Sequence, residues 1–562
     1  MSRIQKEVDI IFVGGGTAAC VTAGRLAKAN PELDILLVEQ GQNNFRDPNV
    51  ITPALSYIHI APGSKTASFW QGNKSTALNG RSPIVLTGRM LGGGSRWASL
   101  FRNIKHPIDP SYHQYQLPKV GSDFDDWKTD GWSSKDILPL LRKMETYHIA
   151  PDKIDKYPAV AQAYLEVAQK RGVPLVKDKH DLDTGHGCQR WAKWVNPVTG
   201  TREDAAHRYI HPLSDNKHLH IMTATKVVHV LFNGTEAIGV EVVADKDTEE
   251  GADQNAHVIK ARKLVVVSAG ALGSPVVLQR SGVGEAERLK KLGTQVVADL
   301  PVGSTFNDHN NRDPEILPQA QAQFSQGKGG LTTDWIDAGS KLRPTPKELE
   351  EIGPAFAPPV MLQALIEGWF GRRDILPHKG ARTIMLGNYT GYPISQGHVY
   401  ITSTDPYAAP DFETGYFNEQ ADVDVHIWGY KHAREIVRRM PQYRGEFVVL
   451  HPNFPEGSAA ACVKLDGPPD VGNVKDIVYT SEDNKAIEAW LRQSIESTWH
   501  PIGTVLMKPK EQGGCVDGRL NVHGTQNLKV ADLSIEQGHG KCRCQHQFGG
   551  FYGWREGSYY HC

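Results

Sequence analysis

The sequence predicts a doubly wound α/β fold, and three observations carry this prediction. A strand, a glycine turn, a helix and a second strand follow one another within the first 40 residues. A further apolar strand runs into a glycine-rich helix start near residue 264. The length of 562 residues accommodates two to four domains at roughly 150 residues each.

The first unit combines residues 8–13, a β-rich apolar run, with the three glycines that follow it. This pattern is typical of a buried parallel strand that enters a tight turn. Residues 20–29 are mostly good helix formers with apolar positions at helical spacing, and residues 35–39 form a second apolar strand that ends in Glu39. The order of strand, turn, helix, strand and acid indicates a dinucleotide site.

Each position of this turn has a physical role. Gly14 permits the tight turn, Gly16 lets the backbone approach a pyrophosphate, and the small Ala19 lets the helix pack on the strand. The helix N-terminus then faces the phosphates, and Glu39 can accept hydrogen bonds from ribose hydroxyls. The expected cofactor-binding residues are therefore Gly14, Gly15, Gly16, Thr17, Ala18 and Glu39. The alternative is a purely structural glycine turn.

Because FAD and NAD share this pattern, two later segments bear on the choice. Residues 88–95 form a glycine run whose backbone could lie against a flavin, with Gly92, Gly93 and Ser95 as contacts; the alternative is a surface loop. Residues 264–268 form a strand that leads into residues 269–275, where Ser274 can cap a helix and Pro275 suits its first turn. That helix is expected to stop at residues 281–282.

A third segment presents a histidine. Ser481 can cap a helix that continues through Ile495, and the helix delivers a loop that contains Trp499 and His500. A histidine just beyond a packed helix is held firmly and remains reachable.

Composition excludes several function classes. The formal net charge is -1, from 62 basic and 63 acidic residues, which gives no field that would gather nucleic acid. No run of 18 apolar residues indicates a transmembrane segment, and residues 1–7 lack the apolar core of a secretory signal. Seven cysteines at irregular spacing fit reduced thiols in a soluble intracellular protein. No metal site is expected, because Cys542 and Cys544 are too few for zinc.

From about residue 7 to Ser534 the chain resembles the glucose-methanol-choline (GMC) oxidoreductases. The glycine turn resembles the ADP-binding loop of the family, residues 270–284 match its second motif throughout, and residues 517–534 resemble the strand and acid, Asp532, that close the flavin site. Residues 64–69, 342–346 and 401–412 are similar to loops of the alcohol (methanol) oxidase branch.

The resemblance implies FAD as the cofactor and a domain of antiparallel sheet and helices inserted into the doubly wound one. The implied FAD-binding domain consists of residues 1–150, 200–310 and 496–535, and the substrate domain of residues 151–199 and 311–495. His500 matches the catalytic histidine of the family, and Val227 the strand position whose backbone meets the adenine. Trp499 would wall the pocket, although an ordinary core aromatic is the alternative.

The implied reaction oxidises a short primary alcohol with oxygen as the second substrate. A base takes the hydroxyl proton while hydride passes to the flavin, and the reduced flavin gives hydrogen peroxide. Another alcohol, an acceptor other than oxygen, and an inactive remnant are the alternatives. A homo-oligomer is left open, and the family resemblance implies a peroxisomal location, although the chain shows no targeting tail.

Three departures from the family pattern stand out. Arg96, Trp97 and Ala98 replace an aliphatic residue and an Asn beside the flavin, and the stretch to Gly121 is unusually long. After Asp308 and His309 the chain reaches Gly329 sooner than alcohol oxidases do, so part of the substrate domain is expected to be missing. Residues 536–562 replace a proline-containing turn, a second catalytic Asn or His and a final helix.

That last segment has the features of a frame-shifted translation. Back-translating residues 540–562 and reading one nucleotide forward is compatible with GNVGANTNSVAFMVGEKAAIII, which resembles the missing family segment. We therefore interpret residues 536–562 as an aberrant tail from mis-splicing or a gene-model error. The alternative is a genuine divergent tail.

Overall fold

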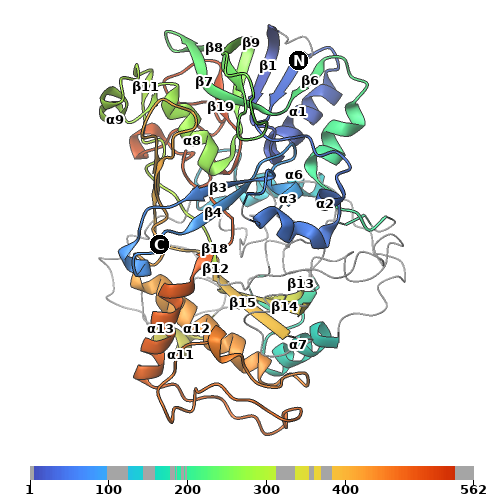
Figure 1. Cartoon of the computed structure of the whole chain (residues 1–562), viewed down its shortest axis with the longest axis vertical. Coiled ribbons are helices and arrows are strands. Elements are labelled where there is room, and N and C mark those ends of the chain that lie inside the picture. The colour runs from blue at the N-terminus through green and yellow to red at the C-terminus, as the bar shows by residue number, and fades with distance from the viewer. Residues whose placement is uncertain are drawn as a thin grey trace.

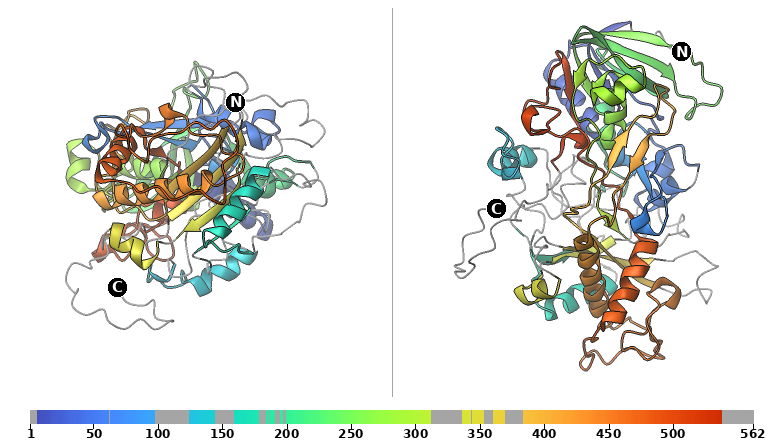
Figure 2. Two further views of the ribbon diagram at one scale, coloured as in Figure 1. Left: turned by 90° about the horizontal axis from the view of Figure 1, so that it is seen from below. Right: turned by 90° about the vertical axis from the view of Figure 1, so that its left-hand side faces the viewer.

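A computed structural model describes residues 6–61, 63–97, 124–143, 159–177, 184, 186–190, 195–196, 199–311, 336–342, 344–352, 360–368 and 383–537. Two lobes are stacked along its long axis (Figures 1 and 2). The upper lobe in Figure 1 contains the N-terminus and a largely parallel sheet, and the lower lobe contains an antiparallel sheet with helices against it. This arrangement confirms the predicted fold class.

The sheet of the upper lobe has seven strands in the order β6-β2-β1-β9-β8-β7, with β19 also paired to β9. Strands β6, β2, β1, β9 and β19 run parallel, while β7, β8 and β9 form an antiparallel meander. The strands are β1 (Glu7–Val13), β2 (Ile35–Val38), β6 (Leu219–Met222), β7 (Thr225–Asn233), β8 (Glu236–Ala244), β9 (His257–Val267) and β19 (Leu528–Val530).

Strand β1 is buried on both faces, as its unbroken apolar sequence predicts. Ile10 and Phe12 belong to the core cluster that contains helix α1 (Thr17–Ala29), whereas Ile11 and Val13 belong to the cluster that contains helix α8 (Gly270–Arg280). The two helices therefore cover opposite faces of the sheet, which is the doubly wound arrangement. Helix α9 (Ala286–Lys291) and the short strands β10 (Val283–Gly284) and β11 (Ala298–Asp299) follow α8.

Short elements connect the two lobes. The hairpin of β3 (Ala67–Gln71) and β4 (Ile84–Gly88) crosses the middle of the molecule in Figure 1, near α2 (Pro48–Ile51) and α3 (Gly94–Trp97). A second small pair, β16 (His398–Tyr400) and β17 (Asp411–Glu413), contacts α8 of the upper lobe. Helix α6 (Ser134–Lys143) also belongs to this region.

The sheet of the lower lobe is antiparallel throughout, in the order β18-β12-β15-β14-β13-β5. Its strands are β5 (Gly187–Arg190), β12 (Asn310–Asn311), β13 (Ile336–Leu342), β14 (Val360–Gly368), β15 (Thr383–Thr390) and β18 (Glu496–Ser497). Helices α7 (Ala159–Lys170) and α12 (Gln420–Val437) pack against this sheet, and α11 (Pro346–Ile352) and α13 (Ser481–Ser494) contact α12. The domain boundaries drawn from the sequence remain a prediction.

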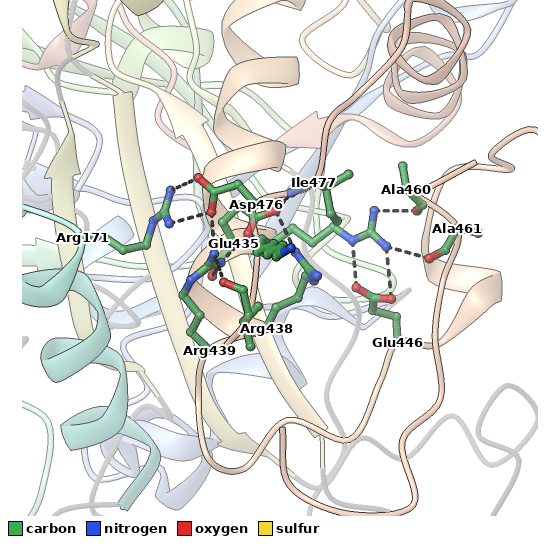
Figure 3. A network of polar contacts seen from close by, with 12 residues as sticks. Arg171, Glu435, Arg438, Arg439, Glu446, Ala460, Ala461, Asp476 and Ile477 are labelled. Carbon is green, nitrogen blue, oxygen red and sulfur yellow. Dashed lines mark hydrogen bonds and ion pairs between the residues drawn. The ribbon is translucent and has the colours of Figure 1, made fainter. Parts of the chain in front are cut away.

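A network of charged side chains anchors the long segment between α12 and α13 (Figure 3). Arg434 contacts both oxygens of Glu446 at 2.8 and 3.2 Å and donates to the carbonyl of Ala460, while Glu435 pairs with Arg438 and Arg439. Arg434 and Glu446 are both nearly buried, a setting in which a bidentate pair with satisfied donors holds its geometry well. The segment is thereby tied to the end of α12.

Two helix starts differ from the sequence prediction. Helix α8 begins at Gly270, so Ser274 and Pro275 lie inside it, and the prediction of Ser274 as its cap is wrong. Helix α13 is capped by Thr480, one residue before the predicted Ser481, because Thr480 and Asp483 form a reciprocal capping box. The end of α8 at Ser281, with Gly282 beyond it, is as predicted.

Candidate active site

The first glycine turn connects β1 to α1, and its geometry requires glycine. Gly14 has φ of +102°, and a Cβ there would lie 2.5 Å from the carbonyl oxygen of Ser268 on the neighbouring strand end. Gly16 takes an extended conformation and precedes α1, which starts at Thr17. The helix therefore starts earlier than the predicted residue 20, and its free N–H groups point out of the turn.

The second glycine loop packs directly on the first. Gly93 has φ of +52°, and a Cβ there would lie 2.8 Å from Cα of Gly16. The amide of Gly92 donates to the carbonyl of Gly15 at 2.8 Å, and the hydroxyl of Thr17 donates to the carbonyl of Gly92 at 3.1 Å. This close approach of two backbones explains the glycines of both loops.

A cavity with an empty volume of about 1640 Å³, open solvent included, runs along these loops. Nine of the predicted site residues line it: Gly14, Gly16, Thr17, Ala18, Glu39, Gly93, Val227, His500 and Asp532. The other three, Gly15, Gly92 and Ser95, are not among the lining residues. They lie in the two glycine loops, and Ser95 donates to the carbonyl of Gly92.

Glu39 ends β2 and is held by the backbone. Its carboxylate accepts hydrogen bonds from the amides of Gly15 and Gly41, both at 2.8 Å. Burial raises the pKa of Glu39 above its usual value, and the two amides oppose that rise. Each carboxylate oxygen has further lone pairs, so acceptance from a ribose hydroxyl remains a prediction.

Asp532 closes the cavity from the other end of the chain. Its carboxylate accepts from the amide of Gly270 at 2.8 Å and from the hydroxyl of Ser274. Asp532, from a distant segment, thus accepts a hydrogen bond from the free N–H at the start of α8. Ser274 is therefore not needed as a cap.

His500 lies in the loop after β18 and is almost completely buried. Its backbone N–H donates to Asp308 at 2.8 Å, and its Nδ1 lies 3.0 Å from the hydroxyl of Thr498. Trp499, immediately before it, has φ of +63°, a left-handed conformation that bulky residues rarely adopt. Strained backbone of this kind persists only where its surroundings enforce it, and it is concentrated at functional sites.

The hydroxyl of Thr498 also donates to the carbonyl of His309. Since this hydroxyl carries one proton, it accepts from Nδ1–H of His500, which assigns the Nδ1–H tautomer to the neutral ring. The other ring nitrogen, Nε2, then carries the lone pair that a general base needs.

Several residues of the site were not predicted. Arg96 is completely buried and pairs with Asp204. This ion pair holds the residues that directly follow the second glycine loop. The segment 401–410 contributes Asp405 and Pro406 to the cavity wall, although the sequence marked it only as a loop typical of one family branch. Arg280 lies two turns after Gly273 on the same face of α8, and it lines the cavity as well.

Two profiles of known protein families match the chain. Both are described as GMC oxidoreductase, and they match residues 8–311 and 393–547. The chain belongs to the GMC oxidoreductase family. FAD is its cofactor, and the cavity fits this group, because the glycine cradle, the N-terminus of α1 and Glu39 border it in the order that an ADP moiety requires.

Two relatives of this GMC chain are alcohol oxidases. Alcohol oxidase from Candida boidinii is 35% identical over 625 residues, which cover 95% of this chain and 91% of the relative. Alcohol oxidase 1 from Komagataella phaffii is 34% identical over 624 residues with the same coverage. These aligned lengths exceed the 562 residues of this chain, so the relatives carry segments that it lacks.

Solved structures share the fold at lower identity. Formate oxidase from Aspergillus oryzae RIB40 superposes with a TM-score of 0.73 at 20% identity, covering 97% of this chain and 96% of that one. Pyridoxine 4-oxidase from Mesorbium loti superposes with a TM-score of 0.67 at 20% identity, covering 94% of each chain.

Several sequence predictions lie outside the described residues. These are the contact of residue 98, the unusual stretch from residue 98 to Gly121, the shortened segment before Gly329 and the tail from residue 538. Within the described residues, no group of three or more His, Cys, Asp or Glu side chains is arranged to hold a metal ion. No helix in the described ranges combines the length and apolar character needed to cross a membrane.

Proposed function

We propose that this protein oxidises short-chain primary alcohols such as methanol to aldehydes and reduces oxygen to hydrogen peroxide. The observation that carries the proposal is that His500, with its base-competent nitrogen, lines the same cavity as both glycine loops. The likeness to alcohol oxidases supports the class of substrate.

FAD, when bound along the two glycine loops, would supply the acceptor for the hydride of the alcohol carbon and the route of its two electrons to oxygen. His500 accepts the hydroxyl proton at Nε2, so that the oxygen lone pair can form the carbonyl as the C–H bond breaks. Thr498 holds the ring by its Nδ1 and thereby keeps the proton off Nε2 before the reaction. A positioned base of this kind typically supplies about 10²–10⁴-fold in rate.

The walls around His500 favour a small substrate. Trp499 lines the cavity and packs on a buried apolar cluster that contains Leu86 and Met90, and Trp70 and Pro501 also line it. Because these bulky side chains stand beside the base, we propose that they limit the length of the carbon chain that can bind there.

The remaining parts of the proposal concern the cofactor and the partners. We assign Gly14, Gly16, Thr17 and Ala18 to the phosphates, Glu39 to the ribose and Val227 to the adenine. Gly15, Gly92, Gly93, Ser95 and Asp532 shape the cradle around them. The substrates are a small alcohol and oxygen.

The test measures peroxide production from methanol and ethanol at matched FAD content. It compares the chain as it stands with a chain in which residues 540–562 are replaced by the shifted-frame segment. We expect little or no turnover from the first chain and clear turnover from the second, because the replacement supplies the second catalytic Asn and the closing helix.

Equal turnover by both chains would show that the tail is genuine. Flavin reduction by alcohol without peroxide would indicate a dehydrogenase, and an FAD-loaded repaired chain that no alcohol reduces would indicate a remnant.

A further inference from the structure

Asp308 is a buried carboxylate behind the His500 loop, and three segments donate hydrogen bonds to it. The hydroxyl of Tyr416 and the hydroxyl of Ser497 donate to one oxygen, and the backbone N–H of His500 donates to the other at 2.8 Å. Asp308 is 3% exposed and Tyr416 2%. Asp308 does not line the cavity, so it acts on the site through its neighbours.

Two consecutive amides of the strained loop depend on this carboxylate. The amide of His500 bonds to it directly, while the amide of Trp499 donates to the Ser497 hydroxyl at 2.7 Å, and that hydroxyl donates to Asp308. Trp499 is the residue with φ of +63°. The left-handed conformation of Trp499 sets the direction of the His500 side chain. Asp308 holds this conformation through the two amides.

Backbone hydrogen bonds on both sides of Asp308 fix the position of its carboxylate. Asn307 exchanges backbone hydrogen bonds with Ile502, and the amide of Thr498 donates to the carbonyl of His309 at 2.8 Å. The segment that carries Asp308 thus lies alongside the loop that carries His500 over its whole length.

We propose that Asp308 is a positioning residue for His500: its ionised carboxylate holds the 497–500 loop in the conformation that aims the imidazole into the cavity. This inference rests on the proposed function, because it assigns a role in the same reaction. Nothing in it requires Asp308 to touch the alcohol or the flavin.

Ionisation of Asp308 is part of the arrangement. Only the carboxylate form accepts from all three donors, since a protonated acid must turn one oxygen into a donor. Burial raises the pKa of Asp308 to about 6, while the hydrogen bonds from Ser497, Tyr416 and His500 oppose the rise. The other titratable groups nearby are His309, whose ring lies 5.5 Å from that of His500, and Glu496 next to Ser497.

The main test is a double-mutant cycle on anaerobic flavin reduction by alcohol in the tail-replaced chain, with Asp308→Asn, His500→Ala and the combined variant. Asp308→Asn should slow reduction by about 10–10²-fold, the range expected when a catalytic group is misplaced by about 1 Å. In the His500→Ala background the same change should alter the rate by less than about 2-fold, because the residue on which Asp308 acts is gone. Equal losses in both backgrounds, or no loss in the first, would overturn the proposal.

A matched control is Asp422→Asn. Asp422 is also a buried aspartate that accepts two backbone amides, those of Ile394 and Ser395, but it does not contact the His500 loop. Its replacement should leave flavin reduction within about 2-fold of the parent. Tyr416→Phe removes a single donor to Asp308 and keeps the ring, so it should lower the rate in the same direction even if Asp308→Asn folds poorly.

A second readout does not depend on turnover. In protein labelled at the histidine ring nitrogens, the His500 resonance is assigned by its loss in His500→Ala and titrated by NMR. Asp308→Asn should shift the His500 pKa downward, because a nearby carboxylate favours the charged imidazole; an unchanged titration would overturn the proposal. If no alcohol reduces the flavin of any chain, the proposed function fails while this titration still decides the role of Asp308.

Discussion

Arg96 and Asp204 form an ion pair in which both side chains are completely buried, with Nε 3.2 Å from a carboxylate oxygen. Arg96 also donates to the carbonyl of Asn43, and Asp204 accepts from the backbone amide of His207 at 3.0 Å. The pair thus joins the start of α3, directly after the second glycine loop, to the segment that precedes β6. Arg96 opens the stretch that departs from the family pattern of an aliphatic residue followed by an Asn, and it has its own buried partner.

Replacing Arg96 by Met should destabilise the protein and impair FAD uptake. Removing Arg96 leaves the buried carboxylate of Asp204 with the ring and amide of His207 as its remaining partners. Breaking a buried ion pair typically costs about 3–5 kcal/mol, and the remaining His207 contacts place the expected loss at the lower end of this range. The urea midpoint and the flavin content of the purified protein measure the two effects. Arg288→Met is the control, because Arg288 pairs with Glu285 at the surface and such pairs contribute at most about 1 kcal/mol. Equal effects of the two variants would contradict the role given to Arg96.

Gly93→Ala should weaken FAD binding. The added Cβ would lie 2.8 Å from Cα of Gly16, so the two glycine loops must separate. Titration of the FAD-free protein with FAD measures the affinity, which we expect to fall by at least about 10-fold, the equivalent of about 1.4 kcal/mol. Gly234→Ala is the control. Gly234 has φ of +61° and no atom within 4 Å of the added Cβ, so this variant has a similar backbone strain but no steric clash. An unchanged affinity in Gly93→Ala would show that the loops need not touch.

Tyr407→Leu should speed the release of FAD. The ring of Tyr407 lies between Lys226 and Lys246, with the ammonium groups 4.3 and 4.0 Å from its centre, and its neighbours Asp405 and Pro406 line the cavity. Losing two cation–π contacts of about 0.5–1 kcal/mol each should raise the rate of FAD release by about 5-fold or more. Tyr400→Leu is the control, because Tyr400 also makes a cation–π contact, with Arg288, but it belongs to β16 and not to the segment of Asp405 and Pro406. Equal release rates in parent and Tyr407→Leu would show that the contacts of Tyr407 with Lys226 and Lys246 do not retain FAD.

The stability of the protein should depend on the ionisation of Asp308. Because the folded-state pKa of about 6 lies above the ordinary value of 3.8, the folded state binds this proton more tightly than the unfolded state. The associated stability is fully present below about pH 4 and is lost as the pH rises through 6. Relative to Asp308→Asn, the free energy of unfolding of the parent should fall by about 2 kcal/mol between pH 4 and 7. A constant difference between the two proteins over this range would contradict a raised pKa.

Local patterns predicted much of this molecule. The strand of residues 8–13, the glycine turn and Glu39 follow one another in sequence, so their geometry is set by neighbours that periodicity and turn chemistry reveal. For this reason one cavity is lined by Gly14, Gly16, Thr17, Ala18 and Glu39. It is also lined by Val227, His500 and Asp532, which were predicted from the family resemblance instead.

Contacts between distant segments explain what the sequence did not predict. Asp532 serves the start of α8 across 262 positions, which made Ser274 a misleading cap, and Arg96 meets Asp204 across 108 positions. Nothing in the local pattern of either segment indicates such a partner. In the sequence Asp308 marked only the start of a shortened segment, because its link to His500 spans 192 positions and appears only in the folded chain.

In the proposed reaction, His500 is the base for alcohol oxidation in a flavin site built by the two glycine loops. The most direct measurement is anaerobic reduction of the bound flavin by methanol in the tail-replaced chain, with and without His500→Ala, at equal flavin content. We expect His500→Ala to bind FAD as the parent does and to slow flavin reduction by about 10²–10⁴-fold. Reduction at the parental rate in FAD-loaded His500→Ala would show that His500 is not the base.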